Sequence, residues 1–355
     1  MENRDMDDGR KREIGTGFVE RINSLRAYVM GVAMLLVMLF HWPFPSGGFL
    51  APLRLGYWGV DVFLFLSGVG IAFSLKRASG EKLGYLGFYG RRLHRIMPAA
   101  LLAGWIFYAT GCSRDVLCLF GMNLWYIRAI MFMYLLAPVF FAVLNKARSI
   151  FPLIVLSCCC EAVAAALIAS HSDNIWAGTW VLQRTPVFLL GMLFFFSDRP
   201  CMSCFGRLFR SRKWMLAWVV VFCLLGLAAR YVRNTCVAGD AARYVELMEF
   251  AFIALAVPFT AWLLASLGNV IPPVVRRCVD WMGRYSLELY LVHEFLFDEI
   301  RAAKHLLPSF SGRFVVAVLV SAVAAWGLKL GVALVERGGC ALFSRLCLFI
   351  RPQKD

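Results

Sequence analysis

The chain has 355 residues, of which 61% are hydrophobic and only 17% are charged. A water-soluble domain of this length needs more polar surface, so the composition excludes a soluble globular protein and predicts a polytopic membrane protein. The formal net charge of +15 does not call for a nucleic-acid partner, because anionic lipid at the cytoplasmic leaflet attracts the same Lys and Arg side chains.

Apolar runs recur along the whole sequence, and each needs about 20 residues to cross the hydrocarbon of a bilayer as a helix. They predict an all-α bundle of about ten spanning helices. Between a cytoplasmic N-terminal tail (1–24) and a cytoplasmic C-terminal tail (336–355) we expect one transmembrane domain (25–335). Its spans are expected at residues 27–44, 56–75, 96–112, 122–144, 149–171, 179–197, 213–231, 243–268, 282–299 and 313–335.

Positive charges orient this bundle. With the N-terminus inside, the expected inner segments hold 26 of the 37 Lys and Arg residues, and the expected outer loops hold seven. This bias follows the positive-inside rule and predicts that both termini are cytoplasmic. The polar residues 1–24 are unlike a cleaved signal peptide, so the first span is expected to act as its own insertion signal.

The twelve cysteines do not predict a metal site or a disulfide. Cys201 and Cys204 form a CxxC pair, but no second pair of Cys or His residues stands at the spacing that a four-ligand zinc site requires. Their expected cytoplasmic position also argues against a disulfide. We therefore expect no bound metal.

Ionisable side chains inside spans are costly in lipid, so each is a candidate functional residue. By the predicted topology, six of them from six helices lie in the outer halves of their spans, where they are expected to line one polar cavity. Considered alone, His41 could be an interfacial histidine beside Trp42, and Arg128 could extend its guanidinium group to the outer surface. The six are His41, Asp61, Arg128, Glu161, Arg184 and His293; Glu288 and Glu294 lie beside the last of them.

A basic segment at residues 88–98 (FYGRRLHRIMP) precedes the third expected span. On a helix, Arg91, Arg92 and Arg95 lie within about one turn and can face one ligand. The guanidinium group matches phosphate oxygens, which predicts binding of a phosphorylated ligand. The alternative is a plain positive-inside anchor. Pro98 is expected early in the helix that follows.

At these residues the sequence resembles the acyltransferase 3 family of bacterial membrane O-acyltransferases. Six blocks carry the resemblance, in family order from about residue 24 to residue 296. They are an Arg…His pair (Arg26 and His41), 59–68 (GVDVFLFLSG), 88–98, 123–138 (NLWYI with YLLAP), 184–192 (RTPVFLLGM) and 285–293 (YSLELYLVH).

The resemblance implies an activity. Family members transfer an acyl group, commonly acetyl, from cytoplasmic acyl-CoA to a hydroxyl of a glycan or lipid-linked sugar at the outer side of the bacterial cytoplasmic membrane. Acyl-CoA would be a co-substrate, with no permanently bound cofactor. Carried over, the arginines of the basic segment would hold the CoA phosphates, and His41 would be the catalytic base.

Acyl transfer also needs groups that help the base and stabilise the developing oxyanion. Asp61 or Glu161 could orient His41, and Arg184 or Trp125 could donate hydrogen bonds to the oxyanion. Direct transfer is the expected route, and an acyl-enzyme on Ser67 or on a cysteine is the alternative.

One feature departs from the family pattern. Fourteen residues separate Arg26 from His41, which is longer than the family spacing by about one helical turn. Position 30, where the usual spacing would place the arginine, holds Met30. This spacing keeps open a non-catalytic relative of the same fold. A transporter or flippase also stays open, because it would share the spans and the intramembrane charges. The acceptor, the acyl chain and the oligomeric state are not predicted.

Overall fold

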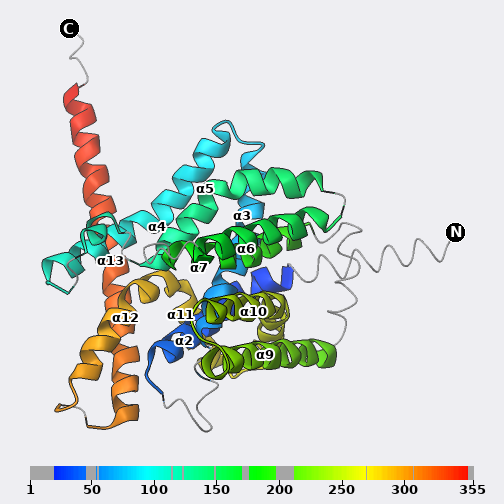
Figure 1. Ribbon diagram of the computed structural model, residues 1–355. Coiled ribbons are helices and arrows are strands. Elements are labelled where there is room, and N and C mark those ends of the chain that lie inside the picture. Colours follow the sequence, from blue (N-terminus) through cyan, green and yellow to red (C-terminus); the bar gives the residue numbers. More distant parts are fainter. Residues whose placement is uncertain are drawn as a thin grey trace. The chain divides into compact units, whose positions relative to one another are not determined.

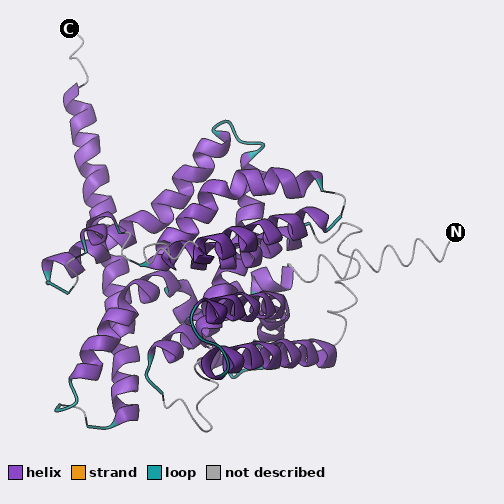
Figure 2. Cartoon of the chain, in the orientation of Figure 1, coloured by secondary structure: helices purple, strands orange, loops and turns teal. Residues whose placement is uncertain are grey.

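The computed structural model describes residues 20–44, 53, 56–112, 115–121, 124–147, 149–169, 176–196, 212–268, 270–306 and 308–350. Over these residues the chain forms helices and short connections and no β-strand, which confirms the predicted all-α class (Figure 1; Figure 2). The elements are α2 (Arg26–His41), α3 (Trp58–Ala78), α4 (Gly84–Ala109), η2 (Val116–Phe120), α5 (Trp125–Lys146), α6 (Phe151–Ala169), α7 (Trp176–Phe194), α9 (Arg212–Thr235), α10 (Asp240–Leu267), α11 (Pro273–Arg284), α12 (Ser286–Ala302) and α13 (Phe310–Ile350).

Each of the ten expected spans overlaps one of these helices. Within the described residues, five helices are long and apolar enough to cross a bilayer, so the chain is a membrane protein. These five are Trp58–Ala78, Trp125–Lys146, Lys213–Thr235, Ala241–Leu267 and Phe310–Gly338, while Arg26–His41 and Phe151–Leu167 are shorter apolar helices.

Three boundaries differ from the expectation. The helix of the third expected span (96–112) begins earlier than expected, because α4 starts at Gly84 and carries the basic segment and Pro98 inside one continuous helix. The ninth is split into α11 and α12 at Tyr285. The last helix, α13, continues to Ile350, well into the segment expected to be a C-terminal tail.

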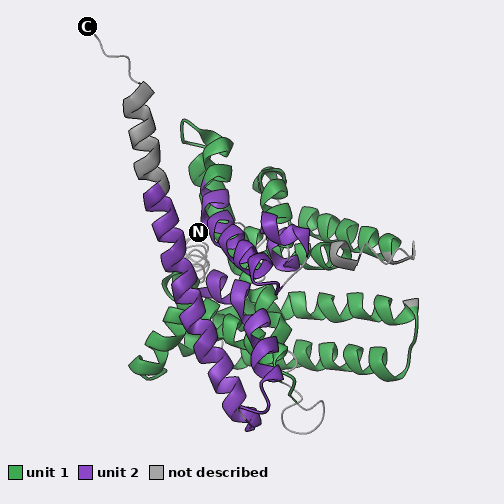
Figure 3. Cartoon of the chain, turned by 90° about the vertical axis from the view of Figure 1, so that its left-hand side faces the viewer, with its two compact units in different colours: residues 1–90, 129–284 green, residues 91–128, 285–355 purple. Residues whose placement is uncertain are grey.

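The chain divides into two compact units (Figure 3). Unit 1 comprises residues 1–90 and 129–284, and unit 2 comprises residues 91–128 and 285–355. Both α4 and α5 contribute residues to each unit, so the two units are continuous through these helices.

In unit 1, α2 and α3 run antiparallel. A Cβ atom on Gly59 would collide with the carbonyl oxygen of Ala33, and one on Gly56 would collide with that of Leu36, so residue numbers rise along one helix as they fall along the other. Amphipathic α11 packs along the N-terminal half of α2. There a Cβ atom on Gly31 would collide with the carbonyl oxygen of Val279. The two contacts of Gly56 and Gly59 fix the register of α3 relative to α2.

The helices α3 and α7 cross where their backbones nearly touch. A Cβ atom on Gly68 would collide with the carbonyl oxygen of Phe188, and one on Gly191 would collide with that of Phe65. Small residues at such a crossing let two membrane helices gain dispersion contacts along their length. The crossing therefore fixes the relative register of α3 and α7.

The helices α9 and α10 form an antiparallel hairpin in unit 1 (Figure 1). Only 17% of the apolar stretch of α9 is buried, which leaves most of its hydrophobic surface for lipid. In contrast, α10 also packs on α3 and α7, so half of its apolar stretch is buried.

In unit 2, the segment after α4 folds back on that helix. The short η2 helix is capped by Asp115, whose carboxylate accepts a hydrogen bond of 2.9 Å from the Leu117 amide. The indole Nε1 of Trp105 donates a hydrogen bond of 3.0 Å to the Leu119 carbonyl, which ties the segment to α4. This segment lies between the end of α4 at Ala109 and the start of α5 at Trp125.

The α3–α7 crossing gives the first prediction. Alanine normally favours a helix over glycine by about 1 kcal/mol, but Gly68→Ala should lower the free energy of unfolding by about 1–3 kcal/mol, because its methyl group meets the Phe188 backbone. Thermal unfolding in detergent micelles measures the effect. Gly90→Ala is the control, since a Cβ atom there meets nothing within 4 Å. Equal stability of the two variants would show that α3 and α7 are not in close contact.

Candidate functional site

His41 ends α2, and its ring is held by its own helix. Nδ1 lies 2.9 Å from the carbonyl oxygen of Val37, one turn earlier, and the ring meets Phe40 edge-on at 5.1 Å between centroids. A carbonyl only accepts, so Nδ1 must donate, and the neutral imidazole therefore carries its lone pair on Nε2. That tautomer suits a general base acting through Nε2.

Asp61 and Arg184 form a buried ion pair between α3 and α7. The Arg184 Nε donates to Asp61 Oδ1 at 3.1 Å, and the two residues are only 5% and 1% exposed. The Arg184 guanidinium also lies 4.6 Å from the centre of the Phe250 ring of α10. The contacts Asp61–Arg184 and Gly68–Met192 advance in the same direction along both helices, so α3 and α7 run parallel, as the predicted topology requires.

Asp61 does not orient His41. The contact of Gly59 with Ala33 puts Asp61 level with the middle of α2, and His41 is eight residues beyond Ala33, about 12 Å along the helix axis. The carboxylate of Asp61 is directed to Arg184 instead. A dyad between Asp61 and His41, one of two carboxylate pairings expected from the sequence, is therefore not formed.

A second polar cluster lies closer to His41, and its α9 and α10 residues were not among the predicted site residues. The Tyr57 hydroxyl donates to Glu249 Oε1 at 2.5 Å, and Arg233 lies 3.1 Å from Glu249 Oε2. The Tyr57 ring packs on Phe40, the neighbour of His41, at 5.6 Å. The Glu249 carboxylate can only accept in this contact, so the phenol of Tyr57 is the hydrogen-bond donor.

The same cluster continues into the α9–α10 hairpin. Arg233 also lies 3.2 Å from Glu246, and Arg230 lies 3.9 Å from Glu249 and over the Tyr57 ring. The sequence signal was present, because both glutamates fall within an expected span. What could not be read from the sequence is that these residues converge on Tyr57.

Arg26 begins α2 at the end opposite His41. Its guanidinium nitrogens lie 3.2 Å from the place that a Cβ atom on Gly70 would occupy, so the side chain lies flat against α3. Fifteen residues of helix put Arg26 about 22 Å from His41 along the axis. Arg26 therefore does not contact the base, and the family role expected for this arginine stays a prediction.

Glu161 is the remaining expected residue of unit 1. It lies on α6, and its Oε2 is buried without a hydrogen-bond partner in the described part of the chain. A carboxyl group in that setting is costly to keep charged. No described contact joins Glu161 to His41, so its role as the orienting carboxylate stays a prediction.

In unit 2 the predicted basic segment is helical. Arg91, Arg92 and Arg95 lie on α4, where Arg91 and Arg95 are exposed and Arg92 is half-buried. On the same turn, His94 lies 3.5 Å from Glu336 of α13. The arrangement gives three guanidinium groups on about one turn, as phosphate binding would need.

The expected residues of the α5 and α12 motifs lie in an aromatic cluster of unit 2. The ring of Tyr126, next to Trp125, is 4.9 Å from Tyr290, which is 5.5 Å from His293. His293 is 1% exposed, and its Nδ1 lies 2.9 Å from the Tyr290 carbonyl, which fixes the same tautomer as in His41. In contrast, Arg128 is exposed. This agrees with the alternative that Arg128 extends to the surface.

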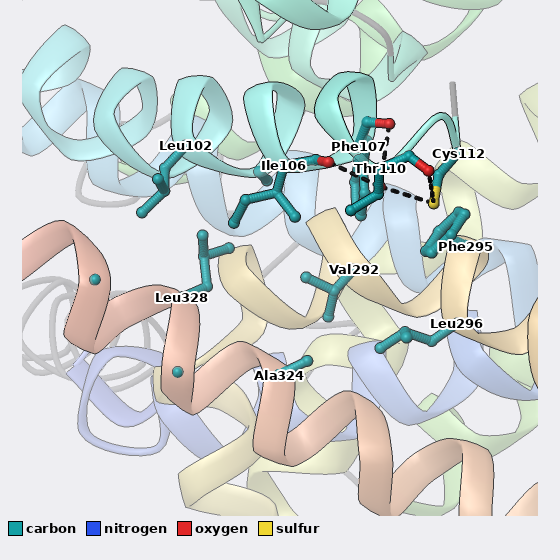
Figure 4. A pocket seen from close by; sticks show the side chains of 13 residues that line it. Leu102, Ile106, Phe107, Thr110, Cys112, Val292, Phe295, Leu296, Ala324 and Leu328 are labelled. Atoms are coloured by element: carbon teal, nitrogen blue, oxygen red, sulfur yellow. Dashed lines mark hydrogen bonds between the residues drawn. The ribbon is translucent and has the colours of Figure 1, made fainter. Parts of the chain in front are cut away.

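Unit 2 also contains an apolar groove between α4, α12 and α13 (Figure 4). Its volume is about 520 Å³, in the range of small-molecule sites. Side chains of Leu102, Ile106, Val292 and Leu328 point into it, while Thr110 and Cys112 lie at one end. The lining suits a hydrocarbon chain and has almost no polar group that could form a hydrogen bond with a sugar.

A family model described as an acyltransferase domain matches residues 28–330. The chain belongs to the acyltransferase 3 family. No curated protein and no solved structure shows significant similarity to it. The family and the apolar helices make the chain a membrane acyltransferase. Arg26 lies two residues before the matched range.

The family blocks fall in both units. His41, Asp61, Glu161 and Arg184 belong to unit 1, and the structure brings Asp61 and Arg184 of these into direct contact. Arg91, Arg92, Arg95, Trp125, Arg128 and His293 belong to unit 2. The expectation that one cavity joins His41 to the groups of unit 2 stays a prediction, as does the exclusion of a metal at Cys201 and Cys204, which lie outside the described residues.

The buried ion pair gives the second prediction. Asp61→Asn or Arg184→Gln leaves the other charge buried without its partner and should each lower the free energy of unfolding by about 3–5 kcal/mol. The double variant should cost less than the sum of the two. Thermal unfolding in one detergent measures all three. Arg301→Gln is the control, because its partner Asp298 is exposed and such pairs contribute at most about 1 kcal/mol. Additive losses would contradict the coupling.

Proposed function

We propose that the chain is an O-acyltransferase of the bacterial cytoplasmic membrane that takes an acyl group, acetyl first among the candidates, from cytoplasmic acyl-CoA. The acceptor is a hydroxyl of a glycan or lipid-linked sugar at the outer face, as in the modification of cell-envelope polysaccharide. The proposal rests on the family match together with one geometric observation, the hydrogen bond from Nδ1 of His41 to the Val37 carbonyl.

That hydrogen bond gives His41 the form that a base requires. With the proton fixed on Nδ1, Nε2 takes the proton of the acceptor hydroxyl as its oxygen attacks the thioester carbonyl. The carbon–sulfur bond then breaks, and the CoA thiolate leaves and recovers a proton from the imidazolium. The products are the acyl ester and free CoA, and the histidine returns to its starting state.

The rest of the chemistry is assigned to groups that have suitable donors. Arg91, Arg92 and Arg95 would bind the CoA phosphates, since three guanidiniums on one helical turn match several phosphate oxygens. Trp125 or Arg184 would donate to the oxyanion; for Arg184 the donors would be its terminal nitrogens, because its Nε serves Asp61. Neither step needs a bound metal or a resident cofactor.

Loss of the base gives the third prediction. His41→Ala should reduce label transfer from radiolabelled acetyl-CoA in membrane vesicles by about 10²–10⁴-fold, the usual contribution of a general base. His305→Ala, at an exposed position in the α12–α13 connection, is the control and should transfer label like the wild type. Transfer by His41→Ala at the wild-type rate would rule out this base and would favour a transporter or another catalytic group.

Loss of the donor site gives the fourth prediction. Replacing both Arg91 and Arg92 by Ala should raise the apparent KM for acetyl-CoA by at least about tenfold, because a hydrogen bond to a charged group contributes about 1.5–3 kcal/mol. The matched control is Arg276→Ala with Arg277→Ala, which removes the same charge from α11. If both double variants change KM equally, general surface charge rather than a phosphate site is responsible.

A further inference from the structure

Arg313 is a buried cation without a protein partner in the described part of the chain. It lies in the first turn of α13 and is 9% exposed. Its Nε is buried with no hydrogen-bond partner, and no described residue forms an ion pair or a cation–π contact with it. A buried guanidinium that lacks an opposite charge is strongly disfavoured, so its setting points to an anion that completes it.

The position of Arg313 in its helix strengthens this conclusion. The N-terminal end of a helix carries partial positive charge, so a cation in the first turn is at the unfavourable end of the helix dipole. Long side chains in a helix also lean toward the N-terminus, which brings the guanidinium toward the same amide groups. An anion at this end would be stabilised by the helix and by Arg313 together.

The face of α13 that carries Arg313 leads into the apolar groove. At 100° per residue, Ala324, Gly327 and Gly331 of the groove lie within about 40° of the direction of Arg313. The nearest of them, Ala324, is eleven residues away, which is at most about 16 Å along the helix. This is about half the roughly 30 Å thickness of a bilayer's hydrocarbon core, the depth that a lipid chain reaches.

We infer that unit 2 binds one anionic phospholipid, with its phosphate on Arg313 and one hydrocarbon chain in the groove between α4, α12 and α13. The apolar stretch of α13 begins at Phe310, so Arg313 lies within one turn of its end, at the level of lipid headgroups. Phosphate suits guanidinium, and the groove, lined by residues such as Leu102 and Val292, suits only the hydrocarbon part of such a ligand. Because Arg313 has no counter-charge among the described residues, a net anionic headgroup is favoured over a zwitterionic one.

The headgroup half of the site is tested by Arg313→Gln. Native mass spectrometry of the delipidated full chain, titrated with dioleoyl phosphatidylglycerol, gives the dissociation constant. The variant should bind about tenfold to a hundredfold more weakly, as expected for a lost charged hydrogen bond. Arg301→Gln is the matched control and should bind within about twofold of the wild type. Equal affinity of Arg313→Gln and wild type would overturn the inference.

The chain half is tested by Gly327→Leu. A Cβ atom at Gly327 meets nothing within 4 Å, so a leucine enters the groove without displacing the backbone and the variant should fold. It should weaken binding of the dioleoyl lipid at least about fivefold, since the leucine occupies space that a chain would fill. Gly338→Leu, farther along α13 and equally open, is the control.

Two outcomes would replace the lipid by another ligand. If Gly327→Leu binds the dioleoyl lipid as tightly as the wild type, no chain occupies the groove and the inference fails. If inorganic phosphate competes for the site as well as phosphatidylglycerol does, the ligand is a free phosphate and the lipid assignment fails. Dioleoyl phosphatidylcholine should bind the wild type at least about tenfold more weakly, because it lacks the net negative charge that Arg313 needs.

Discussion

In a bilayer an ionised side chain is tolerated only beside an opposite charge, a dense set of hydrogen bonds or water, and this constraint organises the whole molecule. Asp61 and Arg184 meet it by pairing across α3 and α7, only a few residues from the place where the two backbones touch. The crossing makes the ion pair possible, because it fixes the two helices in the register that brings these side chains together. Other charges within or next to spans are also paired, in the contacts of Glu249 with Arg233 and of Glu288 with Lys329.

The pairing changes how the proposed chemistry is organised. Because Asp61 forms an ion pair with Arg184, it does not serve as the carboxylate of a His–Asp dyad. His41 instead receives its tautomer from the Val37 carbonyl, so the base depends on the end of α2 rather than on a buried acid. The charged cluster around Tyr57 and Glu249 packs on the ring of Phe40. The cluster therefore packs against the residue next to the base, His41.

Much of the fold was predictable from the sequence, because apolar runs of bilayer length are strong signals. All ten expected spans overlap helices, and the family blocks gave the family that the domain match confirms. The boundaries were less predictable. Pro98 was expected early in its helix, yet α4 runs through it, since a neighbouring helix or turn can satisfy the carbonyl that proline leaves unbonded. The end of α13 was missed for a similar reason, because helix continues past the apolar residues that mark a span.

The sequence alone determined which residues carry charge in lipid and which segments are helical, because cost in hydrocarbon and segment length are local properties. It could not determine the partners of those charges. That Asp61 meets Arg184 instead of His41, and that Glu249 meets Tyr57, depends on helix register, which is set by close contacts such as those of Gly59 and Gly68. Arg313 shows the same division, since the sequence places it at the start of a span and only the packed structure buries it without a protein counter-charge among the described residues. Register is a property of two helices at once, and no single segment encodes it.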